Sequence, residues 1–249
     1  MKTTWRESIF LPAAATLLAV LAIPASAQPV NCTANGGVPP VVRAEGHAEP
    51  LGDFILSCTG GIPTPVGNVV PQVNFSITLN TNLTSHVTQN SSGTDFSEAL
   101  LLIDEPDTVF NPPQRPLRNC GHAGAPDNGV SGPGVCTIVS DGNPLHTYDG
   151  TGNTHGAIAC DGVSGHPAAN SYGCGRPNAY QGRMAVSNSG QVQFLGVPFD
   201  PPGSGTRTFR FTNLRADAAA LGTGGPHPIQ ASIGLNGPTA ITINLPQQV

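Results

Sequence analysis

The stretch "GTRTFRFTNLR", residues 205–215, decides the fold class of this chain. Phe209 and Phe211 alternate with polar residues, so the aromatic side chains point to one face and the polar side chains to the other. This period of two is typical of a β-strand with one face in a core and one face in water. Arg210 belongs to the polar face. Arg207 shares the aromatic face, and we expect its long side chain to reach solvent from the end of the strand.

Similar strand-like segments recur along the chain with turn signals between them, and no long stretch keeps a helical period. The last two, 228–235 and 239–245, flank Asn236-Gly237, a dipeptide that tolerates the positive φ of a tight turn, so we predict a hairpin there. The sequence therefore predicts an all-β fold, an immunoglobulin-like two-sheet sandwich, with a barrel as the alternative. The expected core residues are Phe54, Ile55, Leu56, Phe75, Ile77, Leu79, Leu100, Leu102, Phe194, Phe209, Phe211, Ile233 and Ile243.

Residues 1–27 have the composition of a secretory signal peptide. Lys2 and Arg6 precede an apolar run that ends in the small-residue motif ASA. An N-terminal membrane anchor is the alternative, but prolines interrupt the run, and no later segment is apolar and long enough to span a membrane. We expect a secreted protein that works extracellularly or at the cell surface, with the periplasm also open.

A segment rich in glycine and proline, residues 111–190, divides the remaining sequence into two parts of the β-sandwich, 28–110 and 191–249. The segment holds 15 Gly and 8 Pro, which by itself is typical of disorder. Four of the six cysteines lie in it, and cross-links can hold such a segment in shape. We expect a disulfide-stapled insertion that presents binding loops or serves as a spacer.

All six cysteines follow the signal segment, and an even count in an exported chain indicates disulfide bonds. Six cysteines allow 15 pairings, and the sequence leaves them open. Neighbours in sequence are the easiest to bring together. The favoured pairs are therefore Cys32–Cys58, Cys120–Cys136 and Cys160–Cys174.

The charge balance excludes several classes of function. After residue 27 the chain has eight arginines, fourteen acidic residues and no lysine. A chain without a basic stripe is a poor nucleic-acid binder. The absence of lysine also excludes a Schiff-base lysine and a phosphate-loop lysine in this part of the chain.

Catalytic motifs are mostly absent from the sequence. It contains no G-x-S-x-G elbow and no closely spaced Cys or His pair of the kind that binds zinc. A glycosidase needs two carboxylates across a cleft, and Glu45, Glu49, Asp104 and Glu105 are the available candidates. Acids near strand ends are more simply explained as solubilising charges.

The stretch "DGNPLHTYDGTGN", residues 141–153, is rich in the residues of calcium loops. Asp141, Asn143, Asp149 and Asn153 are candidate calcium ligands, although the spacing departs from the EF-hand and the closing glutamate is missing. Turn formation by Asp, Asn and Gly explains the same composition without a metal. No other cofactor is indicated.

The three tyrosines, Tyr148, Tyr172 and Tyr180, all lie in segment 111–190. Tyrosine is favoured in exposed recognition loops, so these residues are a candidate ligand surface for a glycan or a protein. The alternative is that they cover the disulfides.

Three stretches, "RAEGHAEPLGDFILSCTGG" (43–61), "EALLLIDEP" (98–106) and "GVPFDPPGSGTRTFRFTNLRADAAAL" (196–221), together resemble segments of large secreted bacterial β-sandwich proteins of unassigned function. The resemblance implies an extracellular β-fold and carries no active-site motif, so no functional residue is transferred. We expect a non-enzymatic structural or adhesive protein with an extracellular protein or glycan as partner. A carbohydrate-binding module or a polysaccharide-acting hydrolase is the alternative.

Overall fold

The protein is represented by a computed structural model that describes residues 28–36, 40–89, 95–106, 115–120, 136–151, 154–155, 158–159, 175–184, 189–222, 224, 227–238 and 240–248. The expected signal segment 1–27 lies outside these ranges. The described residues are almost entirely strands and connecting loops, with one short 3-10 helix, η1 (Ala219–Leu221). In this part of the chain no helix has the length and apolar character needed to cross a membrane.

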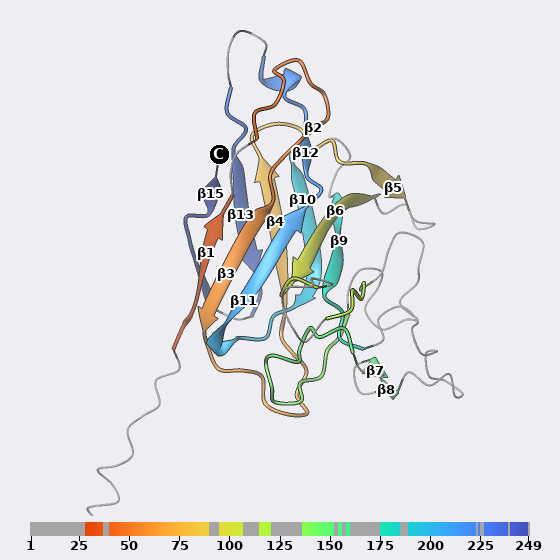
Figure 1. The fold of residues 1–249 in the computed structure, drawn as a ribbon, viewed down its shortest axis with the longest axis vertical. Coiled ribbons are helices and arrows are strands. Elements are labelled where there is room, and N and C mark those ends of the chain that lie inside the picture. Colours follow the sequence, from red (N-terminus) through yellow and green to blue (C-terminus); the bar gives the residue numbers. More distant parts are fainter. Residues whose placement is uncertain are drawn as a thin grey trace, which may run out of the picture.

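Most of the strands belong to one mixed sheet that curls into a nearly closed barrel (Figure 1). Its order is β14-β1-β3-β11-β6-β9-β10-β4-β13-β15, with β5 paired to β6 off this path. The strands of this sheet are β1 (Val30–Asn35), β3 (Phe54–Gly60), β4 (Gln72–Leu79), β5 (Val87–Gln89), β6 (Asp95–Ile103), β9 (Ala179–Met184), β10 (Gln191–Pro198), β11 (Gly203–Thr212), β13 (Ala231–Asn236), β14 (Ile241–Asn244) and β15 (Gln247–Gln248).

Two small pairs of strands complete the secondary structure. β2 (Glu49–Pro50) pairs with β12 (Arg215–Ala216) above one end of the barrel, and β7 (Thr154–His155) pairs with β8 (Ile158–Ala159). The all-β prediction is confirmed, whereas a sandwich of immunoglobulin type is not. The barrel alternative describes the main sheet better.

The segment that contains β14 and β15 brings the two edges of the sheet together. β14 runs parallel to β1, and β15 runs antiparallel to β13. Leu245, between them, has a positive φ of 53°, and the Ile233 N–H donates a 2.9 Å hydrogen bond to the carbonyl of Pro246. One short segment therefore pairs with both edges and nearly closes the ring.

The hairpin predicted at Asn236-Gly237 is wrong. β13 pairs with β4 over its whole length, up to Asn236 opposite Asn74, and β14 pairs with β1 instead. The alternation of apolar residues places Ile233 in the core correctly. Alternation predicts which face of a strand is buried. It does not predict which strand lies beside it, because any strand with a matching apolar face can pair there.

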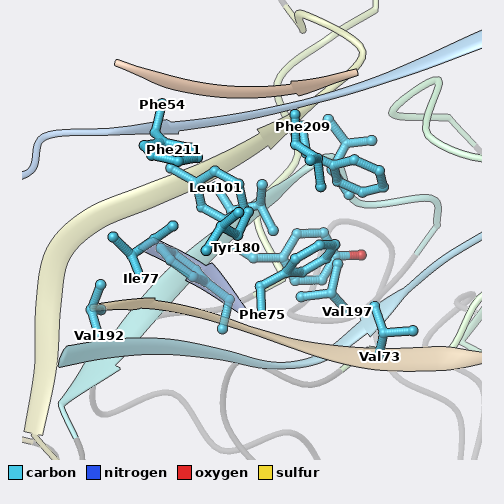
Figure 2. Close-up of a cluster of buried hydrophobic side chains, with 14 of the residues drawn as sticks. Phe54, Val73, Phe75, Ile77, Leu101, Tyr180, Val192, Val197, Phe209 and Phe211 are labelled. Atoms are coloured by element: carbon cyan, nitrogen blue, oxygen red, sulfur yellow. The ribbon is translucent and has the colours of Figure 1, made fainter. Parts of the chain in front are cut away.

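Phenylalanine rings pack against one another in the interior of the barrel, together with aliphatic side chains (Figure 2). The Phe211 ring lies 5.3 Å from Phe194, 5.6 Å from Phe75 and 6.5 Å from Phe54, between ring centroids. Such edge and tilted contacts add roughly 0.5–1.5 kcal/mol per pair beyond the burial of area. The period-two pattern of β11 therefore correctly predicts that Phe209 and Phe211 lie in the core.

On β6 the predicted core residues are on the wrong face. The run from Leu100 to Ile103 is continuously apolar, so no alternation indicates which face of the strand is buried. The structure buries Leu101 and Ile103 fully and leaves Leu100 and Leu102 half-buried. Ile55 and Ile243, also predicted to be in the core, are likewise half-buried.

Part of the segment 111–190 belongs to the barrel. Its β9 lies between β6 and β10 in the main sheet, and Tyr180 and Met184 of that strand join the core. Apolar burial thus contributes to holding this part of the segment in place, in addition to cross-linking.

Two of the favoured disulfides are present. Cys32 and Cys58 are direct partners across β1 and β3, and Cys120 is bonded to Cys136. All four residues are fully buried. The third favoured pair, Cys160–Cys174, lies outside the described residues.

Candidate functional site

The end of the barrel at which β6 and β10 end and β11 begins is filled by a buried arginine. Arg207 faces inward, as the alternation predicts, but its side chain is only 2% exposed, so the expectation that it reaches solvent is wrong. Its guanidinium forms an ion pair with Asp104 and donates a 2.7 Å hydrogen bond to the carbonyl of Pro144. It also lies 4.4 Å from the ring centroid of Tyr148, a cation–π distance.

Asp104 is the acidic centre of this cluster. Its Oδ1 accepts a 3.0 Å hydrogen bond from the N–H of Thr208, and its Oδ2 lies 3.1 Å from Nη1 of Arg115. The backbone of Asp104 has a φ of 55°, in the left-handed region that Asp tolerates better than most residues. One carboxylate thus meets two arginines, one from the barrel and one from segment 111–190.

Tyr148 is part of the same cluster. Its side chain is fully buried, and its hydroxyl donates to the carbonyl of Pro198 at 2.6 Å and accepts from the N–H of Asp200 at 2.9 Å. Burial raises the pKa of Tyr148 far above its ordinary value, and the neighbouring Arg207 opposes that rise only in part. The hydroxyl is therefore a neutral structural group at physiological pH.

The candidate ligand surface of tyrosines is not formed by Tyr148 and Tyr180. Tyr180 is 1% exposed and donates to the carbonyl of Pro177 at 3.3 Å. A tyrosine in a loop can bury its ring whenever its hydroxyl finds a partner, and both of these do. Tyr172 lies outside the described residues.

Asp200 ties two loops to the cluster. It is fully buried and accepts hydrogen bonds from the N–H of Thr64 at 2.8 Å and from Oγ1 of Thr147 at 2.5 Å. The loop 61–71 and the loop 140–151 are therefore held on the same carboxylate. A buried polar network in which each described member has partners favours a single arrangement, and this one links both loops to the end of the barrel.

The candidate calcium ligands are engaged by a guanidinium. Arg176 lies 2.9 Å from Oδ2 of Asp141 and 3.2 Å from Oδ2 of Asp149. His146 Nδ1 also contacts the Asp141 carboxylate at 3.0 Å, and Oδ1 of Asn143 accepts from the N–H of Leu145. The fourth candidate, Asn153, lies outside the described residues.

The pKa of Asp141 reflects this environment. Burial pushes the pKa up, but the N–H of Asn143 and the contacts with His146 and Arg176 together bring it below its ordinary value. A cation entering at this carboxylate would have to displace Arg176. Within the described ranges no group of three or more acidic, His or Cys side chains is arranged to hold a metal ion.

Three of the candidate hydrolase acids are paired with arginines. Asp104 pairs with Arg207 as described. Oε2 of Glu105 lies 2.6 Å from Arg210, and Oε1 of Glu49 lies 3.0 Å from Arg43. Glu45 is exposed. Each of these three carboxylates is thus engaged in an ion pair with an arginine of the protein itself.

The same end of the barrel that holds Arg207 also exposes apolar side chains. They lie on three segments, the loops 61–71 and 140–151 and residues 115–118, and we call them the apolar tip: Ile62, Val66, Val69, Leu117 and Leu145, which are 56–72% exposed. Two of these loops run side by side at the bottom of Figure 1. Backbone hydrogen bonds join the first loop to the second and to the residues just before it. The N–H of Gly67 donates to the carbonyl of Ser140 at 2.8 Å, and the N–H of Val70 donates to the carbonyl of Ile138 at 2.9 Å.

A cavity of about 350 Å³ lies at the opposite end of the barrel, where β1 and β11 end and β3 and β13 begin. Its described lining is mostly aliphatic, with Phe54 and Leu214 at the inner wall. Neither this cavity nor the apolar tip is predicted from the sequence. Each is assembled from loops far apart in the sequence, and no local pattern marks them.

Comparisons with protein-family models, with curated proteins and with solved structures found no match.

Proposed function

We propose that this chain is an exported, non-enzymatic protein that works extracellularly or at the cell surface in a structural or adhesive role. The observation that carries the proposal is the apolar tip. Five of the seven large hydrophobic side chains that are exposed in the described residues belong to it. Single exposed hydrophobic residues are ordinary, whereas a group of them at one end of a molecule marks an interaction surface.

The support beneath the apolar tip favours a contact role. The loops 61–71 and 140–151 are joined by backbone hydrogen bonds and anchored to the buried carboxylate of Asp200. The nearby Cys120–Cys136 disulfide links residues 115–120 to the stretch that leads into the second loop. A surface ordered before it meets its partner loses less conformational entropy on binding.

The two disulfides are compatible with an oxidising, extracellular environment. The alternative role, a carbohydrate-binding module or a polysaccharide-acting hydrolase, has less support. Its candidate acids Glu49, Asp104 and Glu105 pair with arginines, and Tyr148 and Tyr180 are buried instead of offering flat faces to a sugar.

The test compares two exposed hydrophobic sites. The variant Val66→Ser/Leu145→Ser changes the apolar tip. As a matched control, Leu245→Ser changes an equally exposed leucine on the closing segment, residues 241–248, which contains β14 and β15. Binding to whole cells and to arrays of glycans and extracellular proteins is measured with and without calcium. We expect about tenfold weaker binding for the tip variant, no change for the control, and no effect of calcium.

Turnover on polysaccharides and on ester substrates is measured with the same protein samples. We expect none. Saturable hydrolysis that is abolished by one carboxylate-to-amide change, for example Glu45→Gln, would overturn the proposal in favour of the hydrolase. Equal loss of binding in the tip variant and the control would show that the apolar tip is not the contact surface.

A further inference from the structure

The cavity at the end opposite the apolar tip has the size of a small-molecule site. Its volume of about 350 Å³ falls in the range of 300–1,000 Å³ that is typical of ligand pockets. Phe54, 3% exposed, and Leu214, 2% exposed, form the inner wall, while Val41 and His227 are exposed at the outside. The cavity therefore runs from solvent to the edge of the barrel core.

The walls of the cavity are held by backbone contacts that do not involve a ligand. The Leu51 N–H donates to the carbonyl of Leu214 at 2.9 Å, and the Ala219 N–H donates to the carbonyl of Gly46 at 3.1 Å. Phe54 at the inner wall packs edge-on against Phe211 of the core. These contacts join the segments around the cavity to one another and to the core, and a site that needs little ordering on binding gains affinity.

The described lining has almost no polar side chain. It consists of glycine, alanine, proline, valine, leucine, isoleucine and Phe54, with His227 as its one titratable member. A charged ligand group enclosed by such walls would lose hydration without gaining a partner. A sugar, with a hydroxyl on nearly every carbon, would face the same penalty several times over. The lining suits an uncharged, mainly aliphatic molecule.

His227 supplies one polar contact at the side of the cavity. No hydrogen bond from a described residue engages its ring. Gly222, with a φ of 100°, leaves open the space beside it, since a Cβ at that position would lie 3.8 Å from Nε2 of His227. An imidazole nitrogen donates or accepts according to its tautomer, and a hydroxyl group matches either.

We propose that this cavity binds a small, uncharged, mainly aliphatic molecule with one hydroxyl group, which hydrogen-bonds to His227 Nε2. The aliphatic part fills the space in front of Phe54 and Leu214. This role is independent of the apolar tip, because the two lie at opposite ends of the barrel.

The test uses the purified, oxidised protein and the uncharged fluorescent probe N-phenyl-1-naphthylamine, with competing ligands of known chemistry. Decanol is expected to displace the probe saturably, and decanoate, charged at neutral pH, to compete at least about tenfold less well. Cellobiose is expected not to compete. Decanoate or cellobiose competing as well as decanol would overturn the proposal.

Substitutions locate the site. Ala44→Phe fills the cavity and is expected to weaken probe and decanol binding by about tenfold or more. Ala48→Phe adds the same ring on an exposed residue outside the lining and should have no effect. His227→Ala is expected to weaken decanol binding by roughly two- to tenfold, the loss of one hydrogen bond, and to leave the probe unaffected.

Thermal unfolding of each variant checks the fold, and Ala231→Leu provides a second cavity-filling change if Ala44→Phe does not fold. A folded filling variant that binds decanol like the parent would overturn the proposal. Cell binding measured with the same variants should stay at the parental level, so a failure here leaves the adhesive role standing.

Discussion

Replacing Arg207 tests whether the barrel end depends on its buried ion pair. Arg207→Met keeps the apolar stem but removes the ion pair with Asp104, the hydrogen bond to the Pro144 carbonyl and the cation–π contact with Tyr148. Removing one partner of a buried pair costs about 3–5 kcal/mol. Asp104 keeps its contact with Arg115, so we expect the lower value, about 3 kcal/mol.

The matched control is Arg210→Met, three residues along the same strand on the outer face. Arg210 is 29% exposed and pairs with Asp53 and Glu105, and its Nε is buried without a hydrogen-bond partner. Exposed ion pairs contribute about 0.2–1 kcal/mol to stability. Removing the buried Nε, which lacks a hydrogen-bond partner, is stabilising and offsets part of the loss of these ion pairs. We expect a cost of no more than about 1 kcal/mol.

The assay is equilibrium unfolding in urea at pH 7 with both disulfides intact. With a slope of about 2 kcal/mol per molar urea, Arg207→Met should shift the midpoint by about 1.5 M and Arg210→Met by less than about 0.5 M. Asp104→Asn added to Arg207→Met should recover part of the loss, because it removes the weakly paired charge while asparagine tolerates the positive φ. Equal shifts for the two arginine variants would refute the reasoning.

Two further predictions concern pH and the cross-links. The folded chain keeps Tyr148 protonated, while the unfolded chain releases that proton above about pH 10, so the free energy of unfolding should fall there by up to about 1.4 kcal/mol per pH unit. Because the sequence after residue 27 has no lysine, few other groups titrate in this range. In urea unfolding from pH 8 to 11.5, the free energy of unfolding of Tyr148→Phe should therefore fall less steeply than that of the parent. The same pH dependence in both proteins would contradict the role given to Tyr148. Replacing both Cys32 and Cys58 by alanine should cost about 3.5 kcal/mol from a sequence separation of 26, and the Cys120/Cys136 double variant about 3 kcal/mol from a separation of 16. The reverse order of urea midpoints would show that loop length does not govern their contributions.

Local patterns in the sequence predict local features of this fold well. The alternation around Phe209 and Phe211 places both rings in the core, and proximity in sequence pairs Cys32 with Cys58. Each of these inferences needs only residues that are close together along the chain. The continuous apolar run of β6 lacks an alternation, and there the choice of face fails.

Long-range features could not be predicted in this way. Arg207 remains buried because Asp104 meets it from another strand and the Pro144 carbonyl from a loop. A buried arginine and an exposed one look the same in a strand pattern, because only the position of the partner charge separates them. The ion pairs of Arg176 with Asp141 and Asp149 cannot be predicted from the sequence for the same reason.

The closing segment also has a consequence for how the chain is made. β1 pairs with β14 in the register Val30 to Ile241, so two strands from widely separated parts of the sequence must meet. During synthesis from the N-terminus, β1 and β13 are both unsatisfied edges until residues 241–248 have emerged. Open edges of this kind invite pairing with neighbouring chains. The interval before the last strands arrive is therefore the time at which this protein is most exposed to mispairing with other copies of itself.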